Sequence, residues 1–312
     1  MPTELEHPLP PAAAGPPGYA PPAAQAGQRE ISAGLWRLAW RRLRRNPIAT
    51  SSLILIALLL VAAIGAAVLS PYGYKDQARG SEHLAPCWAH GLGTDFLGRD
   101  ILSRLLYGAR ISMLVGVLAT AVSLLIGVNI GLLAGYLGGW ADAVLMRFTD
   151  MVAAFPALLL AVAITALHEK PSIYILFVAL GVVGWTGMAR VVRAQVLSVK
   201  TLDYVTAAQA LGAGRLRIMF RHILPNCVSP IIVLATLAVG GNILGEAGLS
   251  FLGLGVQDPF PSWGGMLNDA RGYFHNYWWV AVFPGVAIVS TVLAFNLFGD
   301  GLRDALDPRA RK

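Results

Sequence analysis

Residues 206–226 read TAAQALGAGRLRIMFRHILPN, a helix-prone stretch that holds four arginines or histidines. The apolar runs on either side of it, 173–192 and 228–244, are long enough to cross the hydrocarbon core of a bilayer. Across all 312 residues, 56% are apolar and 13% are charged, against roughly 25% charged residues in an ordinary soluble domain. A polar surface cannot be built around such a chain, so we expect an all-α protein that crosses a membrane several times.

Six apolar runs are predicted to span the membrane as helices. The first, 48–69, contains no charged residue, and at 1.5 Å per residue it would extend ~33 Å, enough for a hydrocarbon core of about 30 Å. The others are 111–136, 145–167, 173–192, 228–244 and 279–298. Six spans place both termini on the same side of the membrane.

Lysines and arginines divide unequally between the two sides of these spans. Of the 24 in the chain, 17 lie on the side that holds the termini and residues 206–226, and 7 lie on the other side. Because the side richer in lysine and arginine is cytoplasmic, both termini and this segment are expected in the cytoplasm. The net charge of +7 therefore reflects topology and does not indicate a nucleic-acid-binding protein.

The cytoplasmic segment has the pattern of two short helices joined by a tight turn. The run Asp203–Leu211 is expected to end at Gly212, where glycine can adopt the left-handed conformation that closes a helix. A second run, 215–223, is expected to end before Pro225. The apolar residues available for burial in this hairpin are Leu211, Leu216, Ile218 and Phe220. Its smooth first helix suits insertion into a groove on another protein; alternatively, its arginines hold it on anionic lipid headgroups.

Small residues predict close packing between spans. The four-residue glycine spacing that lets helix backbones approach closely in lipid occurs twice, in Gly127, Gly131 and Gly135 and again in Gly241 and Gly245. Simple helix contact is the first interpretation, and a contact that moves during transport is the alternative.

Motifs of several enzyme classes are missing. The chain has no GxxxxGK[ST] motif and is not expected to bind ATP on its own. It has no HExxH motif, its six histidines lack ligand spacing, and its two cysteines form no CxxC pair, so neither a catalytic metal nor a disulfide scaffold is expected. Cys87 and Cys227 are predicted on opposite sides of the membrane.

An ion-coupled carrier is expected to hold ionisable residues deep in its spans. Here Glu246 and Asp300 lie near predicted span ends. Asp142 and Asp150 flank the start of the third span, where solvated and helix-capping roles are predicted.

Several stretches of the chain resemble one transporter family. Thr206-Ala207-Ala208, Gly212 and Leu224-Pro225 are similar to the EAA loop of binding-protein-dependent ABC importer permeases. Three longer stretches resemble the C-type permease subunit of the dipeptide, oligopeptide and nickel group: HGLGTDFLGRDILSRLLYGARIS (90–112), LMRFTDMVAAFPALLLAVAI (145–164) and GLSFLGLGVQDPFPSWGGML (248–267). WRLAWRRLRRNPIA, before the first span, resembles the extra N-terminal segment of that group.

The chain departs from the family pattern at two positions of the loop. Thr206 stands where the EAA motif has an acidic residue, and His222 stands where that motif usually has an aliphatic residue. The Ala-Ala, Gly and Leu-Pro framework of the motif is kept.

The resemblance implies the MetI-like transmembrane domain of a type I ABC importer, in a bacterial cytoplasmic membrane. The expected partners are a homologous second permease, two cytoplasmic ATPases that bind ATP and Mg, an extracytoplasmic binding protein and membrane lipid. The chain itself is expected to hold no cofactor, no metal and no catalytic residue. Dipeptides or short oligopeptides are the first choice of substrate, with nickel, glutathione or another small solute as alternatives. A self-contained secondary carrier or channel is the alternative from a different class.

The resemblance also implies a division of the chain. The predicted parts are a disordered Pro/Ala-rich tail (1–35), an amphipathic segment with the first span (36–70), an extracytoplasmic loop (71–107), the importer domain (108–302) with its coupling loop (200–225), and a cytoplasmic tail (303–312).

Two sets of residues are candidates for function. The set expected to contact the ATPase is Thr206, Ala207, Ala208, Gly212, Arg215, Leu224 and Pro225. The set expected to form an extracytoplasmic gate or to dock the binding protein is Asp95, Gly98, Arg99, Asp100, Gln257, Pro261 and Trp263. For the second set, packing at the rim of the bundle is the alternative.

Overall fold

The computed structural model describes residues 35–168 and 172–306, whose regular elements are all helices. The helices are α2 (Leu35–Arg45), α3 (Pro47–Ile64), α4 (Ala66–Leu69), α5 (Ile101–Leu137), α6 (Gly139–Ala153), α7 (Ala157–Ala166), α8 (Ile173–Val199), α9 (Asp203–Ala210), α10 (Arg215–Arg217), the π-helical turn η1 (Ile218–Ile223), α11 (Leu224–Phe251), α12 (Trp263–Ala270) and α13 (Trp279–Leu306). The all-α prediction is confirmed. Most of the predicted tail 1–35 lies outside the described residues.

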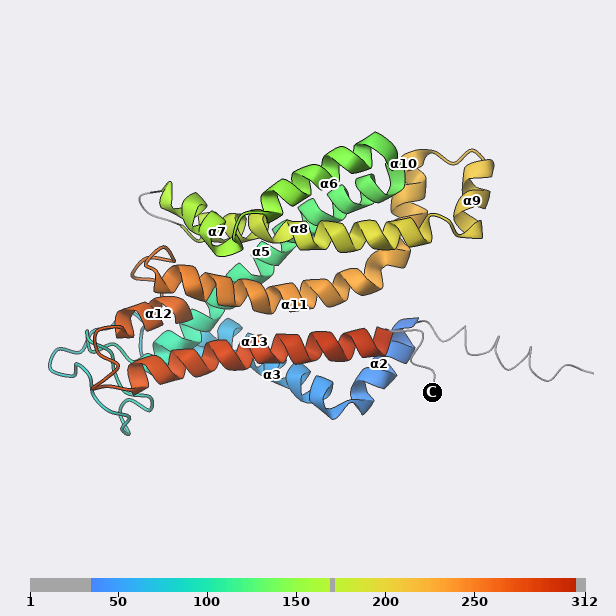
Figure 1. Cartoon of the computed structure of the whole chain (residues 1–312). Coiled ribbons are helices and arrows are strands. Elements are labelled where there is room, and N and C mark those ends of the chain that lie inside the picture. Colours follow the sequence, from blue (N-terminus) through green and yellow to red (C-terminus); the bar gives the residue numbers. More distant parts are fainter. Residues whose placement is uncertain (1–34, 169–171, 307–312) are drawn as a thin grey trace, which may run out of the picture.

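The chain passes along the bundle six times. Within the described residues, five helical segments are long and apolar enough to cross a membrane, namely α3, α5, α8, the continuous segment 215–251 and α13, and the bent pair α6–α7 makes a sixth. Figure 1 shows α9 at one end of the bundle, here called the α9 end, and α12 with the loop 70–100 at the opposite, α12 end. Both α2 and the last turns of α13 lie at the α9 end.

The third predicted span is not one straight helix. The apolar run 145–167 is divided between α6 and α7, whose axes differ by 80°. Pro156 lies at the break; it has no N–H to donate, and its ring disfavours helical geometry at Phe155. The prediction of a single helix here is wrong, because an apolar run shows where a chain can enter lipid and does not show where it bends.

The second span begins ten residues earlier than predicted. Arg110 and Arg104 interrupt the apolar pattern, yet α5 runs through both positions. Asp100 caps the helix by accepting a hydrogen bond from the Ser103 backbone N–H at 2.8 Å. Asp95 pairs with Arg104, so this buried charge is compatible with the helix.

Glycines allow α5 and α8 to pack in close contact. A Cβ atom added at Gly127 would lie 2.7 Å from the Met188 Cβ, and one added at Gly131 would lie 2.5 Å from the Ala189 carbonyl oxygen. A Cβ at Gly135 would lie 2.8 Å from a Val196 side-chain carbon. Real Cβ atoms do not approach their neighbours so closely, so this interface depends on glycine.

The short helix α2 packs sideways against the end of α13. Ala39 and Leu43 are buried in a cluster with Ala49 and Ala305. Asn46 then separates α2 from α3 and caps α3, because its Oδ1 accepts the backbone N–H groups at the start of that helix. The arginine-rich face of α2 is thereby held at the α9 end.

Candidate coupling and translocation sites

The hairpin at the α9 end projects beyond the spans (Figure 1). Gly212 has φ +76°, the left-handed conformation predicted from its position. Its N–H donates to the Gln209 carbonyl at 2.9 Å, and the Ala213 N–H donates to the Ala208 carbonyl at 3.1 Å. These two bonds close α9 and turn the chain into α10.

The second helix of the hairpin was predicted to end before Pro225, and this prediction is wrong. It continues through α10 and η1 into α11, which makes one helical segment over 215–251. In η1 the Leu224 N–H bonds to the Met219 carbonyl, five residues earlier. Pro225 has no N–H to donate, and a regular α-helix would end or kink there. The π-helical turn, in which residues five apart are paired, accommodates the proline and lets the helix continue.

The tip of the hairpin presents apolar and cationic side chains to its surroundings. Of the apolar residues available for burial, Ile218 is 1% exposed, whereas Leu211 is 88%, Leu216 is 68% and Phe220 is 49% exposed. The side chains of Thr206, Ala207, Arg215, Arg217 and Arg221 are also exposed. Three large apolar side chains exposed together are typical of a surface that another protein covers.

The base of the hairpin is fixed to the spans. Val205 of α9 is completely buried and belongs to one cluster with Met219, Ile223, Val196 and Leu132. This cluster joins α9 to η1, α8 and α5. A displacement of α9 therefore pushes on three other helical elements.

A groove of about 570 Å³ lies beside the hairpin. It is lined by Tyr136, Leu137, Lys200, Thr201, Thr206, Gln209 and Arg215. The Lys200 Nζ donates to the Gly135 carbonyl at 2.8 Å and fixes one wall. Sequence reasoning found Thr206 and Arg215 but missed this groove, because Tyr136 and Leu137 of its wall come from the end of α5, about 70 residues earlier in the chain.

A cavity of about 750 Å³ lies between α7, α8, α11 and α13. Its walls are small or apolar residues, Asn242 is its one amide side chain, and no ionisable residue of the described chain lines it. The Asn242 Nδ2 donates to the Thr120 Oγ1 at 2.9 Å. Leu267 of α12 contributes to the lining at the α12 end.

The second glycine pair lies along this cavity. A Cβ at Gly241 would meet no atom within 4 Å, so Gly241 makes no close helix contact in this chain. A Cβ at Gly245 would lie 2.9 Å from the Leu180 Cδ2, the far end of a flexible side chain. The two glycines widen the cavity rather than bring two backbones together.

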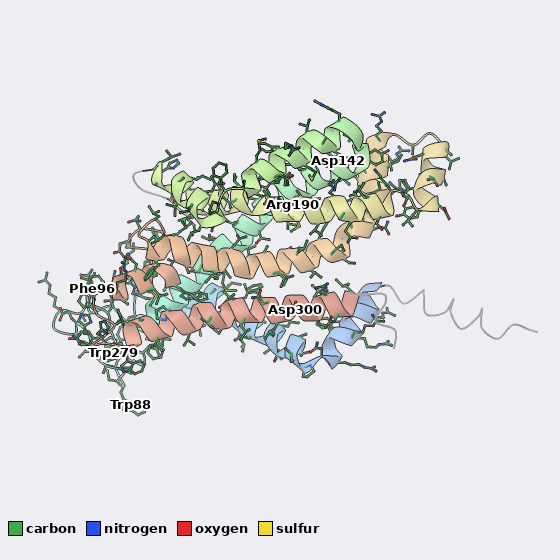
Figure 2. The ribbon with its side chains drawn as sticks, viewed as in Figure 1. Trp88, Phe96, Asp142, Arg190, Trp279 and Asp300 are labelled. Carbon is green, nitrogen blue, oxygen red and sulfur yellow. The ribbon has the colours of Figure 1, made fainter. Side chains whose placement is uncertain are left out.

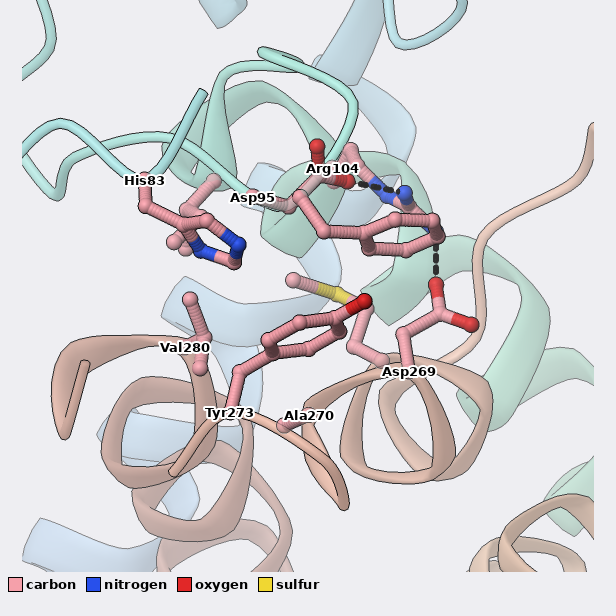
Figure 3. A pocket seen from close by; sticks show the side chains of 10 residues that line it. His83, Asp95, Arg104, Asp269, Ala270, Tyr273 and Val280 are labelled. Carbon is pink, nitrogen blue, oxygen red and sulfur yellow. Dashed lines mark hydrogen bonds and ion pairs between the residues drawn. The ribbon is translucent and has the colours of Figure 1, made fainter. Parts of the chain in front are cut away.

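An ion cluster holds the loops at the α12 end. The Arg99 Nε lies 2.6 Å from the Asp95 Oδ2, and Arg104 pairs with the same carboxylate. Both guanidinium groups reach Asp269 of α12, at 3.3 Å from Arg99 and 3.1 Å from Arg104, and Figure 3 shows Arg104 between its two carboxylates. Burial raises the pKa of Asp269 above its ordinary value of 3.8, although both arginines oppose that shift.

The predicted gate and docking residues have largely structural contacts. Asp95 and Arg99 belong to the ion cluster, and Asp100 caps α5 while it accepts a bond from the His90 Nδ1 at 2.9 Å. Gly98 has φ +70°, and a Cβ there would lie 2.3 Å from the Ala78 carbonyl oxygen.

The remaining members of this set lie in the loop before α12 and at its start. Trp263 is 1% exposed and donates through Nε1 to the Leu105 carbonyl at 3.0 Å. Pro261 is also buried, and Gln257 is the one exposed member of the set. The fully exposed Trp88, at the far tip of the loop in Figure 2, was not singled out by sequence.

Two acidic residues are ion-paired between helices. Asp142 was expected to be solvated, but it forms a bidentate pair with Arg193 of α8, at 2.5 Å to Nε and 2.6 Å to NH2. Asp150 lies 3.1 Å from Arg190, one turn earlier on α8, and Figure 2 labels Asp142 and Arg190 on the two helices. The two aspartates on α6 and the two arginines on α8 have opposite charges, and this pattern in the sequence could have predicted the ion pairs.

Glu246 lies in the last turns of α11, which continues past the predicted span to Phe251. Its side chain is completely buried and accepts hydrogen bonds from the Ser112 Oγ at 2.8 Å and the Ser250 Oγ at 2.6 Å. The partner Ser112 lies on α5, 134 residues away, so no local pattern could indicate this contact. Asp300, in contrast, is exposed near the α9 end of α13 (Figure 2).

Among the described residues, no group of three or more His, Cys, Asp or Glu side chains is placed to hold a metal ion. Cys87 is exposed in the loop at the α12 end, and Cys227 is buried at the start of α11. Cys87 thus belongs to the loop 70–100 and Cys227 to the helix that continues from the hairpin.

Comparisons with known proteins agree with this architecture. Residues 127–312 match the family model for the binding-protein-dependent transport system inner membrane component. Residues 34–86 match the N-terminal TM domain of oligopeptide transport permease C.

Three relatives illustrate the similarity. The chain is 46% identical over 279 residues to the glutathione transport system permease protein of Pectobacterium atrosepticum, covering 88% of this chain and 92% of that protein. It is 45% identical over 275 residues to the dipeptide transport system permease protein of Bacillus subtilis, covering 88% and 86%. It is 43% identical over 298 residues to the oligopeptide transport system permease protein of Bacillus subtilis, covering 94% and 97%.

Proposed function

Because the chain belongs to the family of binding-protein-dependent transport system inner membrane components, we propose that it is a permease subunit of an ATP-driven importer of dipeptides or short oligopeptides. The cavity between α7, α8, α11 and α13 carries this proposal. Its lining is uncharged and mostly apolar, so it favours no particular side-chain charge on a solute. Peptides share a backbone and differ in their side chains, and such a wall tolerates that variety.

Glutathione is the second candidate substrate. It is favoured by the 46% identity to a glutathione transport system permease protein. Glutathione is itself a small peptide, so both candidates need the same kind of pathway.

We place the α9 end in the cytoplasm and the α12 end outside. The support is the unequal distribution of lysine and arginine along the sequence, since 17 of 24 are predicted on the same side of the membrane as residues 206–226. The exposed loop that carries Trp88 would then face the binding protein, while the ion cluster around Arg99 and Arg104 holds that loop in shape.

The hairpin would transmit ATPase movement to the pathway. Ala207 is exposed on α9, and the same hairpin exposes Leu211, Leu216 and Phe220, an apolar surface suited to a groove on an ATPase subunit. ATP and Mg would be bound by that subunit. When its movement displaces α9, the buried Val205 pushes on η1 and α8, which lead into the helices that line the cavity.

A homologous second permease would complete the pathway. The cavity is lined from one side by this chain, and the apolar surfaces of the spans, such as Leu125 at 70% exposure, require lipid or another subunit to cover them. The complete importer would thus contain two permeases, two ATPases and a binding protein within a lipid bilayer.

The test is uptake of a labelled dipeptide into proteoliposomes by this chain alone and by the complete complex. Uptake that needs ATP, the second permease, the ATPases and the binding protein is the expected result. Uptake by the single chain without ATP would instead show a self-contained carrier or channel and would overturn the proposal.

A further inference from the structure

The short helix α12 is fixed at both ends by polar contacts. Its last turn is held by Asp269, which contacts Arg99 and Arg104. Its first residue is held differently: the Trp263 N–H donates to the Ser112 Oγ at 3.3 Å. Between these ends, a Cβ at Gly264 would lie 2.5 Å from the Ala247 Cα, so α12 is pressed against α11.

Glu246 connects the contacts at the first turn of α12. One carboxylate oxygen accepts from Ser112, the residue that also receives the Trp263 N–H. The other accepts from Ser250, whose Oγ lies 3.3 Å from the Oγ of Ser262, the residue that caps α12. A single buried side chain thus bonds to α5 and α11 and supports both residues that begin α12.

The hydrogen-bond partners of Glu246 are all serine hydroxyls, and it is 0% exposed. A buried carboxyl group costs free energy unless its oxygens are bonded, so the serines and Glu246 hold one another in place. If α12 moved away, Ser112 would lose the Trp263 N–H and Ser250 would lose the Ser262 hydroxyl.

The position of α12 gives this network a role. Leu267 of α12 lines the cavity at its α12 end. Ala247 and Gly248, the two residues of α11 that follow Glu246, also line it. In the proposed orientation, Leu267 therefore places α12 in the wall at the end where a solute would enter. We propose that Glu246 is a positioning residue that holds α12 closed over the outer end of the pathway through Ser112, Ser250 and Ser262. This inference rests on the proposed function, in which α12 lies on the extracytoplasmic side.

The experiment uses the complete importer in proteoliposomes and a reporter cysteine on α12. Ala270, which is 3% exposed, is replaced by cysteine in a Cys87→Ser background, and labelling by a membrane-impermeant maleimide is followed on this chain. In the parent, we expect slow labelling without nucleotide and faster labelling with binding protein and a non-hydrolysable ATP analogue.

The variants separate positioning from general stability. Glu246→Leu should raise the nucleotide-free labelling rate roughly tenfold, because two buried hydrogen bonds to the network are lost. Glu246→Gln keeps one acceptor oxygen, and its amide N–H can donate to the other serine Oγ, so this variant should label at close to the parent rate. Ser123→Ala removes another buried hydroxyl bond, between α5 and α8, and serves as the control that should not change labelling.

Labelling of Glu246→Leu at the parent rate would overturn the proposal, and so would Glu246→Gln that labels as fast as Glu246→Leu. If Glu246→Leu does not assemble, Ser112→Ala provides the same measurement with a smaller expected increase. Labelling requires no particular solute, so failure of dipeptide uptake would refute the proposed substrate alone. A labelling rate that never responds to nucleotide would refute the importer itself.

Discussion

Replacing Gly131 with alanine tests whether the contact between α5 and α8 determines the stability of the bundle. The new Cβ would lie 2.5 Å from the Ala189 carbonyl oxygen, 2.8 Å from the Val192 Cβ and 3.0 Å from the Arg193 nitrogen. Two of these neighbours are backbone atoms, so the strain is relieved only if the helices move apart. Overpacking of this kind costs about 1–3 kcal/mol, and alanine recovers about 0.5–1 kcal/mol of helix propensity.

The expected net result for Gly131→Ala is a loss of about 1–2 kcal/mol, measured as a lower midpoint of thermal unfolding in detergent. Gly241→Ala is the matched control, because Gly241 also lies within a span and a Cβ there meets no atom within 4 Å. The control should be as stable as the parent or slightly more so. Equal midpoints for the two variants would refute the argument that glycine is required for the α5–α8 contact.

Further predictions concern coupling, ion pairing, pH and sidedness. Ala207→Arg adds a bulky charge to the exposed face of α9 and should reduce ATP-dependent uptake at least roughly tenfold while the complex still assembles; normal uptake would contradict coupling through α9. In a double-mutant cycle with Asp142→Asn and Arg193→Gln, the bidentate pair should show a coupling free energy of about 1 kcal/mol in thermal unfolding, and additive effects would mean that the pair contributes nothing. The raised pKa of Asp269 means that the folded state binds its proton more tightly than the unfolded state, so the stabilisation is present below pH 3.8 and is lost as the pH rises through the raised pKa. Asp269→Asn should remove that part of the pH dependence of the unfolding midpoint. Finally, a membrane-impermeant maleimide added to intact cells should label the exposed Cys87, and labelling only after lysis would reverse the proposed orientation.

The sequence predicted the features that depend on local pattern. Apolar runs located all six passes through the bundle, and the hairpin was placed between the correct spans. The left-handed conformation of Gly212 was predicted because the requirement for glycine there is a property of one residue.

The features that were missed depend on contacts between distant residues or on alternative ways to satisfy a proline. Pro156 breaks the third span, whereas Pro225 is accommodated by a π-helical turn, and nothing local distinguishes the two. Glu246 was predicted near a span end, but its complete burial was not predicted, because that burial depends on a serine on α5. The contacts of Arg99 and Arg104 with Asp269 likewise join segments about 170 residues apart.

The unbroken helix from Arg215 to Phe251 gives the molecule a mechanical property. Its 37 residues form one continuous helical backbone, and Figure 1 shows that this backbone turns where α10 leads into α11. The long arm α11, of 28 residues, extends about 42 Å at 1.5 Å per residue, so a tilt of about 5° at the hairpin would displace its far end by about 4 Å. The π-helical turn η1 and Pro230 are two points where the segment can bend. The hairpin and the opposite end of the bundle can therefore exchange force along a single piece of backbone, without a relay of separate side chains.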